Sequence, residues 1–523
     1  MGLRYEFDLL CTDVISHNAR VFANKTAVVC GDDRLTWRAL EERTNRVANA
    51  VRGLGLGKGD KVALFMPNSL ALFELFWGVA KAGCVVVSLN TMLEGSALVR
   101  LTNASDAKAI FADGSTRGLI DAVRGELEKV AGENYFLVEG DPGEGWRAAA
   151  EIFDAADPQP PGVKVTPEDS MTIIFTSGTT GVPKGIEHSH FGRLNYPLGF
   201  GVGLRVDRYS VAICSTPIYA SGTWITMFPT MYRGGTVVLL PKYSPEAFLD
   251  AVRRERGTHA FLVPTQCIGL LQQPLSSYDL SSLKVLVTAG QSLLPATYEA
   301  LLENLPGVRL YEIYGMTEGF STLAMPEDVQ QGKRGSVGKP AFLEDIRIID
   351  EEGRELPVGE TGEIVGYGPG MMKGYYARPE LTEAATWVSP WGRTYMRSGD
   401  AGHLDADGYL YVSGRIKDMI KSGGINIYAA DIEEIFMRHP AVREVAVVGV
   451  RHEKWSETPI AVVILKPGER AAADDIKAWA NDRLSKYQRV TAVVIQEDLP
   501  RATYGKVQKQ VLRDRYAETF LTA

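Results

Sequence analysis

The sequence predicts an α/β protein with a large N-terminal domain and a smaller α+β C-terminal domain. The chain has 523 residues, and at roughly 100–200 residues per domain this length suggests three or four core-sized units. Strand and helix patterns alternate over most of the chain, which is typical of parallel sheets covered by helices. Near residue 337 the pattern changes to short strands between Gly, Pro and Asp turns, which indicates small antiparallel sheets.

The first predicted helix begins after Thr36, whose hydroxyl suits an N-cap. Side chains that suit a buried face then recur at helical spacing. They are Trp37, Leu40, Thr44, Val47, Ala48 and Val51. Three glycines, Gly53, Gly55 and Gly57, end this helix before the next strand.

A βαβ unit is predicted next. The segment Lys61–Met66 (KVALFM) is a predicted strand, Ser69–Ala82 a predicted helix, and CVVVSL after Gly83 the following strand. Gly83 occupies the position after a helix where glycine is favoured, because only glycine adopts a left-handed conformation at no steric cost. Two strands joined through a helix pair in parallel.

The rest of the chain divides by composition. Residues 141–167 are rich in Pro, Gly, Ala and Asp and are predicted to form a connection, and a second α/β region extends over about residues 171–319. After residue 416 short helices and strands alternate again, and residues 417–523 are enough for a separate domain. We therefore expect an N-terminal domain over residues 1–416 and a C-terminal domain over residues 417–523.

Composition and charge exclude several classes of protein. Hydrophobic residues make up 45% of the chain and charged residues 23%, which are ordinary values for a globular protein and exclude a disordered or collagen-like chain. Lys and Arg number 56 and Asp and Glu 64, so the formal net charge is −8. A mildly acidic chain has no overall attraction for a polyanion, so nucleic acid is not the expected partner.

The cysteines and the apolar segments indicate a cytoplasmic protein. The five cysteines are far apart and never in a CxxC pair, so neither a disulfide framework nor a zinc site is expected. The N-terminus lacks the basic and apolar regions of a signal peptide. The longest apolar run, Leu70–Val87, contains Glu74 and Lys81, so no membrane span is expected.

The most informative segment is IIFTSGTTGVPKGIEHSH, Ile173–His190. An apolar strand leads into a run of Thr, Ser and Gly residues, followed by Lys184. Hydroxyls and successive backbone N–H groups of this kind donate hydrogen bonds to phosphate oxygens, and glycine lets the backbone approach an anion closely. The segment is not a Walker A loop, because Pro183 precedes Lys184 and Gly185 follows it.

Within this segment, TSGTTGVPKG resembles the phosphate-binding loop of the adenylate-forming superfamily, which includes acyl-CoA synthetases, peptide-synthetase adenylation domains and luciferases. Three further motifs follow in the family's order. They are YEIYGMTEG (Tyr311–Gly319), a long segment from Tyr395 to Glu434, and RATYGKVQK (Arg501–Lys509). The resemblance covers almost the whole chain. It implies an N-terminal domain of two α/β subdomains plus a small β-barrel-like subdomain, with a mobile C-terminal domain.

The resemblance implies a set of ATP- and AMP-binding residues. Asp400 resembles the carboxylate that accepts both ribose hydroxyls, Arg415 a second ribose or phosphate contact, and Tyr314 the ring that stacks on adenine. The whole set is Thr176, Ser177, Gly178, Thr179, Thr180, Lys184, Ala289, Gly290, Glu312, Tyr314, Asp400 and Arg415.

The resemblance also implies catalytic roles for Lys506, Thr317 and Glu318. A lysine between the substrate carboxylate and the α-phosphate of ATP offsets the repulsion between two anions, and this is the role of Lys506. Glu318 resembles the family's Mg²⁺ ligand, since a hard cation bound to phosphates prefers a carboxylate oxygen. Lys417 occupies the hinge position, and the path of the CoA thiol is lined by Ser422, Gly423 and Gly424.

The acyl pocket is where the chain departs from many acyl-CoA synthetases. Tyr219 stands where many of them have a histidine, Ile313 stands where fatty-acid and coumarate enzymes often have glycine, and Tyr504 replaces a usual small or hydroxyl residue. By position alone, the pocket is lined by Tyr219, Ala220, Ser221, Trp224 and Ile313. These residues are uncharged, which favours an aryl, alicyclic or medium-chain acid. Ile313 argues weakly against long straight chains.

We therefore predict an ATP- and Mg²⁺-dependent acyl- or aryl-CoA synthetase. The nearest alternative is a stand-alone adenylation enzyme that loads a carrier-protein phosphopantetheine, and a luciferase-type oxygenase is another. A nucleotide-sensing module without catalysis would be expected to lack Lys506, Glu318 or Asp400, yet all three are present. The oligomeric state stays open, with a homodimer as one option.

Two other signals are discounted. The run Gly53–Gly59 resembles a dinucleotide fingerprint, but it lies between a helix and a strand instead of between a strand and a helix. His188 and His190 are not needed as bases, because the substrate carboxylate is already ionised at pH 7.

Overall fold

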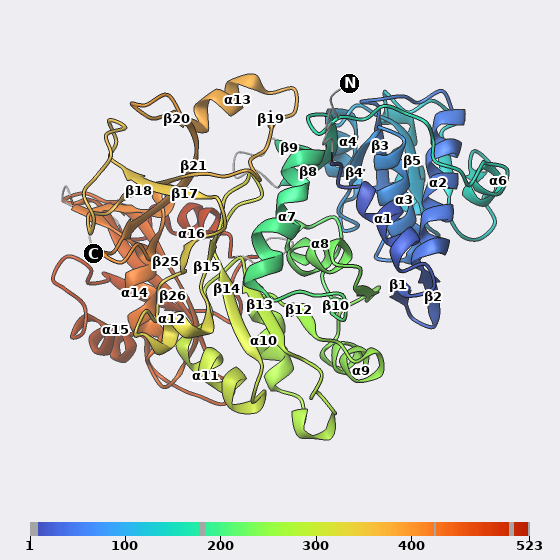
Figure 1. Ribbon diagram of the computed structural model, residues 1–523. Helices are drawn as coiled ribbons and strands as arrows, with labels where there is room; N and C mark the ends of the chain where they lie inside the picture. Colours follow the sequence, from blue (N-terminus) through green and yellow to red (C-terminus); the bar gives the residue numbers. More distant parts are fainter. Residues whose placement is uncertain (1–8, 177–183, 423–424, 502–506, 521–523) are drawn as a thin grey trace. The chain divides into compact units, whose positions relative to one another are not determined.

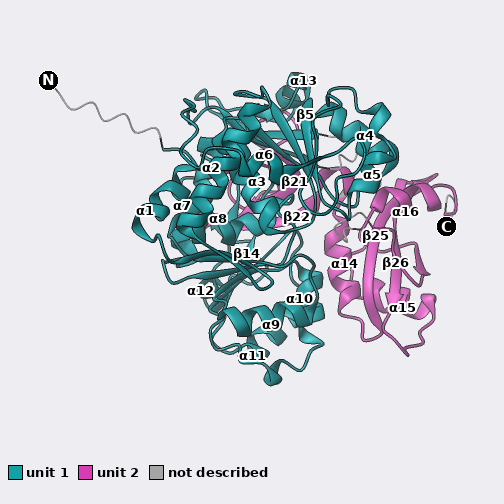
Figure 2. Cartoon of the chain, turned by 90° about the vertical axis from the view of Figure 1, so that its right-hand side faces the viewer, with its two compact units in different colours: residues 1–345, 366–396 teal, residues 346–365, 397–523 magenta. Residues whose placement is uncertain are grey.

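Two large sheets with helices on their faces form most of the computed structural model, shown in Figure 1. The structure describes residues 9–176, 184–422, 425–501 and 507–520. These residues divide into two compact units, drawn in teal and magenta in Figure 2: unit 1 contains residues 1–345 and 366–396, and unit 2 contains residues 346–365 and 397–523. Each unit is described by itself.

The eight-stranded sheet of unit 1 has the order β19-β9-β8-β4-β3-β5-β6-β7. Its strands are β3 (Lys61–Phe65), β4 (Val85–Ser88), β5 (Ala107–Ala112), β6 (Tyr135–Leu137), β7 (Arg147–Ala148), β8 (Ser170–Thr176), β9 (Lys184–Ser189) and β19 (Gly374–Tyr375). The strands from β8 to β7 in this order pair in parallel, whereas β9 is antiparallel to both β8 and β19. The predicted βαβ unit is present, because β3 and β4 pair in parallel.

The helices of this region begin where the sequence predicts. Helix α2 (Trp37–Gly53) is capped by Thr36, whose hydroxyl accepts a hydrogen bond from the backbone N–H of Ala39 at 3.2 Å. Helix α3 (Leu70–Lys81) is capped in the same way by Ser69, at 3.1 Å from the backbone nitrogen of Leu72. Gly83 has φ +78° and follows the end of α3. The other helices here are α1 (Asp13–Val21), α4 (Gly95–Ala104), α5 (Arg117–Asp121), η1 (Arg124–Glu126) and α6 (Ala149–Asp154).

The seven-stranded sheet of unit 1 has the order β14-β13-β12-β10-β11-β1-β2. Its strands are β1 (Thr26–Cys30), β2 (Asp33–Thr36), β10 (Val211–Cys214), β11 (Thr236–Leu239), β12 (His259–Phe261), β13 (Val285–Ala289) and β14 (Arg309–Ile313). All neighbours pair in parallel except β1 and β2. Its helices are α7 (His190–Gly203), η2 (Ser221–Thr223), α8 (Trp224–Tyr232), α9 (Pro245–Glu255), α10 (Pro264–Leu271), η3 (Leu275–Ser277) and α11 (Pro295–Asn304).

Aromatic rings join α3 to α8 in the largest core cluster of unit 1. The ring centroid of Phe76 lies 5.4 Å from those of both Trp77 and Trp224, and Trp224 stacks on Phe228 at 5.0 Å. Rings packed at these distances contribute about 0.5–1.5 kcal/mol per pair beyond the area that they bury. Helix α8, which follows the predicted acyl segment, is therefore anchored in the core.

A smaller five-stranded sheet follows in the chain. It contains β17 (Asp345–Ile349), β18 (Gly362–Tyr367), β20 (Thr386–Val388), β21 (Thr394–Leu404) and β22 (Leu410–Arg415). The pairs β20–β21 and β21–β22 are antiparallel, as the sequence predicts. The short elements nearby are β15 (Thr322–Leu323), α12 (Pro326–Gln330), β16 (Lys339–Pro340) and α13 (Pro379–Ala384).

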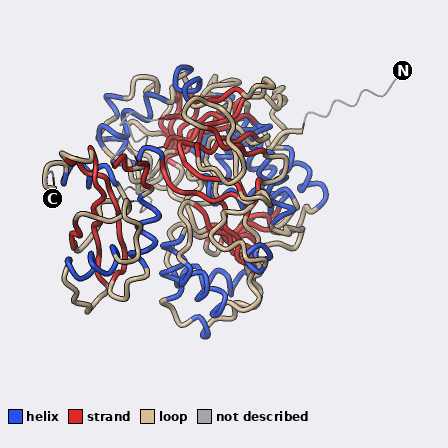
Figure 3. The backbone as a smooth tube through the Cα atoms, turned by 90° about the vertical axis from the view of Figure 1, so that its left-hand side faces the viewer, coloured by secondary structure: helices blue, strands red, loops and turns tan. Residues whose placement is uncertain are grey.

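The remainder of unit 2 is a second small α/β arrangement, with strands in red and helices in blue near the C-terminus of Figure 3. Its sheet has the order β24-β23-β26-β25, and β27 pairs with β26. The elements are η4 (Ile416–Asp418), β23 (Ile420–Ser422), β24 (Ile425–Ile427), α14 (Ala429–Met437), β25 (Val442–His452), β26 (Ser456–Leu465), α15 (Ala473–Asn481), β27 (Ala492–Ile495) and α16 (Lys509–Tyr516). The helices and strands predicted after Arg415 are thus present.

The compact units do not coincide with the predicted domains 1–416 and 417–523. Residues 346–365 and 397–416 group with the C-terminal part of the chain, where helix α14 contacts strand β22. The boundary at Lys417 was predicted as the point about which the C-terminal domain rotates, whereas the compact units are defined by contacts between residues. The hinge at Lys417 therefore stays a prediction.

Candidate active site

The predicted adenine-binding residues lie at the carboxyl ends of two neighbouring parallel strands. Strands β13 and β14 end at Ala289 and Ile313, which are partners in the register. Gly290 and Tyr314 follow these strands directly, so they leave the sheet side by side at one edge. Gly290 has φ +91°, and a Cβ placed on it would have no atom within 4 Å. The structure thus brings Ala289, Gly290 and Tyr314 together beside open space, and their role in binding adenine stays a prediction.

A tight hairpin after β14 carries the two predicted catalytic residues of unit 1. Gly315 and Ser321 form a bridge across it, and the backbone nitrogen of Met316 donates to the carbonyl oxygen of Phe320 at 3.2 Å. Gly319 in the turn has φ +129°, and a Cβ there would lie 2.2 Å from the Cα atom of Met371. Only glycine fits this position. The turn presents Thr317 and Glu318, which are both partly exposed.

Tyr375 links Glu318 to the strand that follows the predicted phosphate loop. Its hydroxyl donates to Oε1 of Glu318 at 2.8 Å, and the Nζ atom of Lys184 lies 5.0 Å from its ring centroid. Strand β19, which contains Tyr375, pairs with β9 next to Lys184. Tyr375 carries no signal in the sequence, because a two-residue strand has no periodicity and GYY matches no motif.

The predicted acyl segment meets the catalytic hairpin through two hydroxyls. The Oγ atom of Ser221 lies 3.2 Å from Oγ1 of Thr317. Ser221 begins η2, which follows the carboxyl end of β10, and β10 belongs to the same sheet as β14. The sheet therefore places a predicted acyl residue within hydrogen-bond distance of a predicted phosphate-binding residue.

The other predicted acyl residues differ in their surroundings. Ala220 is partly exposed, Tyr219 is 8% exposed and Ile313 is 7% exposed, and burial raises the pKa of the Tyr219 hydroxyl. Trp224 is fully buried, and its Nε1 donates to the carbonyl oxygen of Ile218 at 2.8 Å. Trp224 thus packs in the core beneath the acyl segment, and its contact with substrate stays a prediction.

Glu312, predicted to bind nucleotide, has a structural partner. Its Oε1 accepts a hydrogen bond from the backbone nitrogen of Leu293 at 3.0 Å, and burial raises its pKa. This bond fixes the loop after β13, which contains Gly290. In this conformation Glu312 supports the backbone of the loop that contains Gly290, one of the predicted adenine-binding residues.

In unit 2, the two predicted ribose residues form an ion pair. Asp400 and Arg415 are partners across β21 and β22, and Nη1 of Arg415 lies 3.1 Å from Oδ1 of Asp400. The same Nη1 donates to the carbonyl oxygen of Ser398 at 3.0 Å. Lys417 is exposed in η4, and Ser422 ends β23.

Several predicted residues lie outside the described part of the chain. They are Ser177, Gly178, Thr179, Thr180, Gly423, Gly424 and Lys506. Of Thr176 only the backbone is described, as the last residue of β8 and the register partner of Lys184. The roles of all eight stay predictions.

The histidines of the EHSH segment are both fully buried. Burial lowers the pKa of His188 well below its ordinary value and that of His190 to about 4. Both rings are therefore neutral at pH 7. That the reaction needs neither of them as a base stays a prediction.

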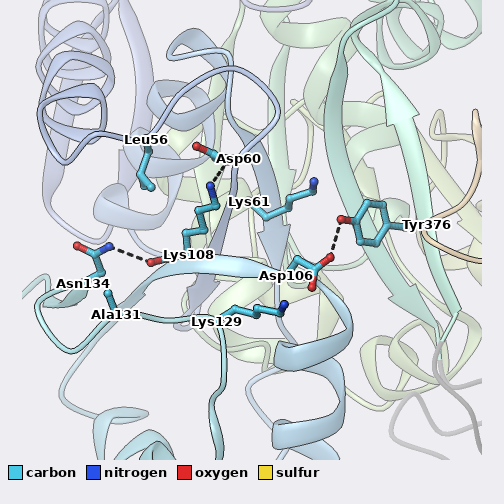
Figure 4. A pocket seen from close by; sticks show the side chains of 9 residues that line it. All are labelled: Leu56, Asp60, Lys61, Asp106, Lys108, Lys129, Ala131, Asn134 and Tyr376. Carbon is cyan, nitrogen blue, oxygen red and sulfur yellow. Dashed lines mark hydrogen bonds and ion pairs between the residues drawn. The ribbon is translucent and has the colours of Figure 1, made fainter.

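A cavity of about 420 Å³ lies at the amino ends of β3, β5 and β6 (Figure 4). In this cavity Lys108 pairs with Asp60 at 2.7 Å, and the hydroxyl of Tyr376 donates to Asp106 at 2.9 Å. Strand β8 runs parallel to these strands. The predicted phosphate loop follows the carboxyl end of β8 in the chain, whereas the cavity lies at the amino ends of the neighbouring strands. The cavity contains none of the predicted site residues. Its lining is Leu56, Asp60, Lys61, Asp106, Lys108, Lys129, Ala131, Asn134 and Tyr376.

The α/β fold places a carboxylate-bearing hairpin next to β19, which pairs with β9, the strand that follows the predicted phosphate loop in the chain. The chain matches the model of the AMP-binding enzymes over residues 15–376 and that of the AMP-binding enzyme C-terminal domain over residues 431–506. It therefore belongs to the AMP-binding enzyme family.

Similar proteins are CoA ligases. The chain is 35% identical over 505 residues to a feruloyl-CoA synthase from Amycolatopsis sp., covering 95% of this chain and 97% of that one. It is 34% identical over 517 residues to the indoleacetate–CoA ligase of Aromatoleum aromaticum, covering 97% and 98%. The solved structure of the anthranilate CoA ligase AuaEII with anthranoyl-AMP superposes with a TM-score of 0.87 at 26% identity, covering 98% of each chain.

These comparisons confirm the predicted adenylate-forming superfamily, the α/β fold class and the assignment to AMP-forming acid–thiol ligases of the acyl- and aryl-CoA synthetase type. In the described residues, no helix combines the length and apolarity that a membrane crossing requires.

Proposed function

We propose that this chain converts an aryl, alicyclic or medium-chain carboxylic acid to its CoA thioester in two steps. The carboxylate first attacks the α-phosphate of ATP, which gives acyl-AMP and pyrophosphate. The CoA thiol then attacks the acyl carbon, which gives the thioester and AMP. The contact of Ser221 with Thr317 at 3.2 Å carries the proposal, because it joins the acyl segment to the phosphate-binding hairpin.

The residues divide the work of the first step. Lys506 offsets the charge between carboxylate and α-phosphate, and Thr317 donates its hydroxyl to phosphate oxygen. Lys184 adds a positive charge beside the phosphate loop. Asp400 accepts the ribose hydroxyls, and Tyr314 stacks on adenine.

The site also fits Mg²⁺. The Glu318 carboxylate is partly exposed, and its partner at Oε1 is the neutral hydroxyl of Tyr375. A neutral donor leaves the negative charge of the carboxylate available to a hard cation. Glu318 would hold the ion together with phosphate oxygens, and the ion would neutralise charge on the leaving pyrophosphate.

An aromatic acid is the substrate that the surroundings favour. The predicted lining is uncharged and contains the ring of Tyr219, and the branched side chain of Ile313 would narrow one side of such a pocket. Two similar ligases are named for ferulate and indoleacetate, and a third for anthranilate. All three names denote acids with an aromatic ring.

The second step, thioester formation, uses CoA as the acceptor and follows a rotation of the C-terminal domain. Rotation about Lys417 would withdraw Lys506 and bring Ser422, Gly423 and Gly424 to the thiol path, which is how hinge motion serves two reactions in one site. A carrier-protein phosphopantetheine is the alternative acceptor.

We place the reaction in the cytoplasm, where the five free cysteines stay reduced. A homodimer is the oligomer that we would test first.

The test is a coupled assay of pyrophosphate and AMP release, with and without CoA. The acids are benzoate, cinnamate, ferulate, indoleacetate, cyclohexanecarboxylate and fatty acids of increasing length. CoA-dependent AMP release with one class of acid supports the proposal. Pyrophosphate release that ignores CoA would support the carrier-protein alternative, and turnover with long fatty acids alone would overturn the proposed substrate class.

A further inference from the structure

Arg193 is a fully buried cation to which the sequence analysis gives no role. It lies in the first turn of α7 with no exposed surface. Its Nε donates to Oγ1 of Thr172 at 3.0 Å. Within the described residues neither Nη1 nor Nη2 makes a hydrogen bond of good geometry, although the side chain of Tyr196 lies close enough to stabilise the guanidinium. A buried charge without a full set of partners destabilises a fold.

The charge persists despite burial. Burial lowers the pKa of Arg193 to about 10, so the guanidinium stays protonated at pH 7. Its compensation is aromatic: the guanidinium carbon lies 4.4 Å from the ring centroid of Trp224 and 5.7 Å from that of Tyr196. A desolvated cation over an indole face is among the stronger contacts of this kind. Arg193 thus fixes one face of Trp224.

Trp224 in turn holds the acyl segment. Its Nε1 donates to the carbonyl oxygen of Ile218 at 2.8 Å, while the backbone nitrogen of Ile218 donates to Oδ1 of Asn68 at 2.9 Å. The turn between Ile218 and Trp224 contains Tyr219, Ala220 and Ser221. Its Ser221 reaches Thr317. The contacts therefore run from Arg193 through Trp224 to the acyl turn and the catalytic hairpin.

We propose that Arg193 is a positioning residue for acid binding, which holds the acyl turn 218–224 in register with Thr317 through the indole of Trp224. The proposal rests on the proposed function, since it assigns the acyl pocket to that turn. Arg193 also joins this turn to β8, the strand before the predicted phosphate loop, through Thr172. Its place between two substrate-binding segments explains why a polar residue is retained in an apolar core.

The test compares R193M and R193K with a matched control, R124M. Arg124 also lies over a ring, 3.8 Å from the centroid of Tyr135, but belongs to the region beside β6. In R193M we expect the KM for the acid to rise about tenfold, because small misplacements of a substrate-binding group cost rate and affinity. The KM for ATP and the melting temperature should stay close to wild type, since an apolar side chain of similar size removes a buried charge. R193K keeps the charge but loses the planar stack on the indole. Its KM for the acid should therefore lie between those of wild type and R193M.

A second measurement tests the contact between Arg193 and Trp224 and needs no substrate. The protein is labelled with 5-fluorotryptophan, and the ¹⁹F resonance of Trp224 is assigned from W224F. R193M and R193K should shift this resonance, and R124M should leave it unchanged. An unmoved resonance, or an equal rise of both KM values with a lower melting temperature, overturns the positioning role. Absence of turnover in wild type with every acid would instead overturn the proposed function, and the resonance would still decide the role of Arg193.

Discussion

The two compact units hold their predicted site residues by different kinds of contact. In unit 1, Glu318 is held by the neutral hydroxyl of Tyr375 at 2.8 Å. In unit 2, Asp400 is held by the guanidinium of Arg415 at 3.1 Å. Both acceptors are carboxylates, and a hydrogen bond to a charged group contributes about 1.5–3 kcal/mol. The donors differ in charge: the hydroxyl of Tyr375 brings no positive charge to Glu318, so this carboxylate can still attract a metal ion, whereas the guanidinium of Arg415 already offsets the charge of Asp400.

The largest effect is expected from K506A, which removes the cation assigned to the space between the substrate carboxylate and the α-phosphate. Loss of a charge that stabilises the transition state lowers acid-dependent pyrophosphate exchange by about 10²–10³-fold. Thioester formation from supplied acyl-AMP should fall much less, because the lysine has no role in that step. The control is K486A, an exposed lysine of the same unit. Equal loss in both half-reactions would contradict the assignment.

D400N tests the charged contact of unit 2. The amide keeps the shape of the carboxylate but loses its charge, so the KM for ATP should rise about 10–100-fold, with the KM for the acid almost unchanged. The matched control is D350N, because Asp350 also pairs with an arginine of unit 2, Arg354, at 2.7 Å. If both variants raise the KM for ATP alike, Asp400 is a structural partner of Arg415 and not the ribose ligand.

Y375F tests the contact between Glu318 and an uncharged donor in unit 1. Removal of the hydroxyl leaves Glu318 without this donor, and kcat should fall about tenfold, near the lower end of what a hydrogen bond to a charged group contributes, because Glu318 is partly exposed and water can replace the hydroxyl. The Mg²⁺ concentration for half-maximal activity should change as well, because the carboxylate is less firmly oriented. The neighbouring variant Y376F removes a hydroxyl that donates to Asp106. Its activity should match wild type, and a loss as large as that of Y375F would count against the Glu318 assignment.

The smallest effect is expected from a carboxyl group behind the hairpin. Glu344 accepts hydrogen bonds from the backbone nitrogen and the hydroxyl of Ser321, and burial raises its pKa to about 8. The folded state thus binds a proton between about pH 4.5 and 8 that the unfolded state has released, so this group's contribution to stability is full below pH 4.5 and is lost as the pH rises towards 8.

The measurement is chemical denaturation of wild type and E344Q from pH 5 to 9. The glutamine does not titrate, so the free energy of unfolding of E344Q should lose about 1–2 kcal/mol less over this range than that of wild type. Parallel pH profiles for the two proteins would show that Glu344 is ionised in the fold at neutral pH.

Local signals in the sequence predicted most of the framework. The hydroxyl of Thr36, the apolar run of β3 and the position of Gly83 each depend on nearest neighbours, and all three are found as expected. Tyr375 could not be predicted, because it reaches Glu318, which lies 57 residues earlier in the chain, only when β19 pairs with β9.

Burial was the other quantity that the sequence could not supply. Trp224 was predicted at the acyl pocket, and its indole proves to be fully buried against Phe76 and Phe228. Arg193 has a charged side chain that would usually face solvent, so nothing in the helix pattern marked it as a core residue. The order of motifs, by contrast, was enough to identify the family.

The chain passes between the two compact units three times, near residues 345, 365 and 396. A chimera made at any one of these points would therefore divide at least one unit between the two parents. A crossover at the predicted boundary, Lys417, would also divide unit 2. Asp400 and Arg415 would then come from one parent and Lys506 from the other, so the residues predicted to bind the nucleotide and to activate the acid would be recombined by one crossover.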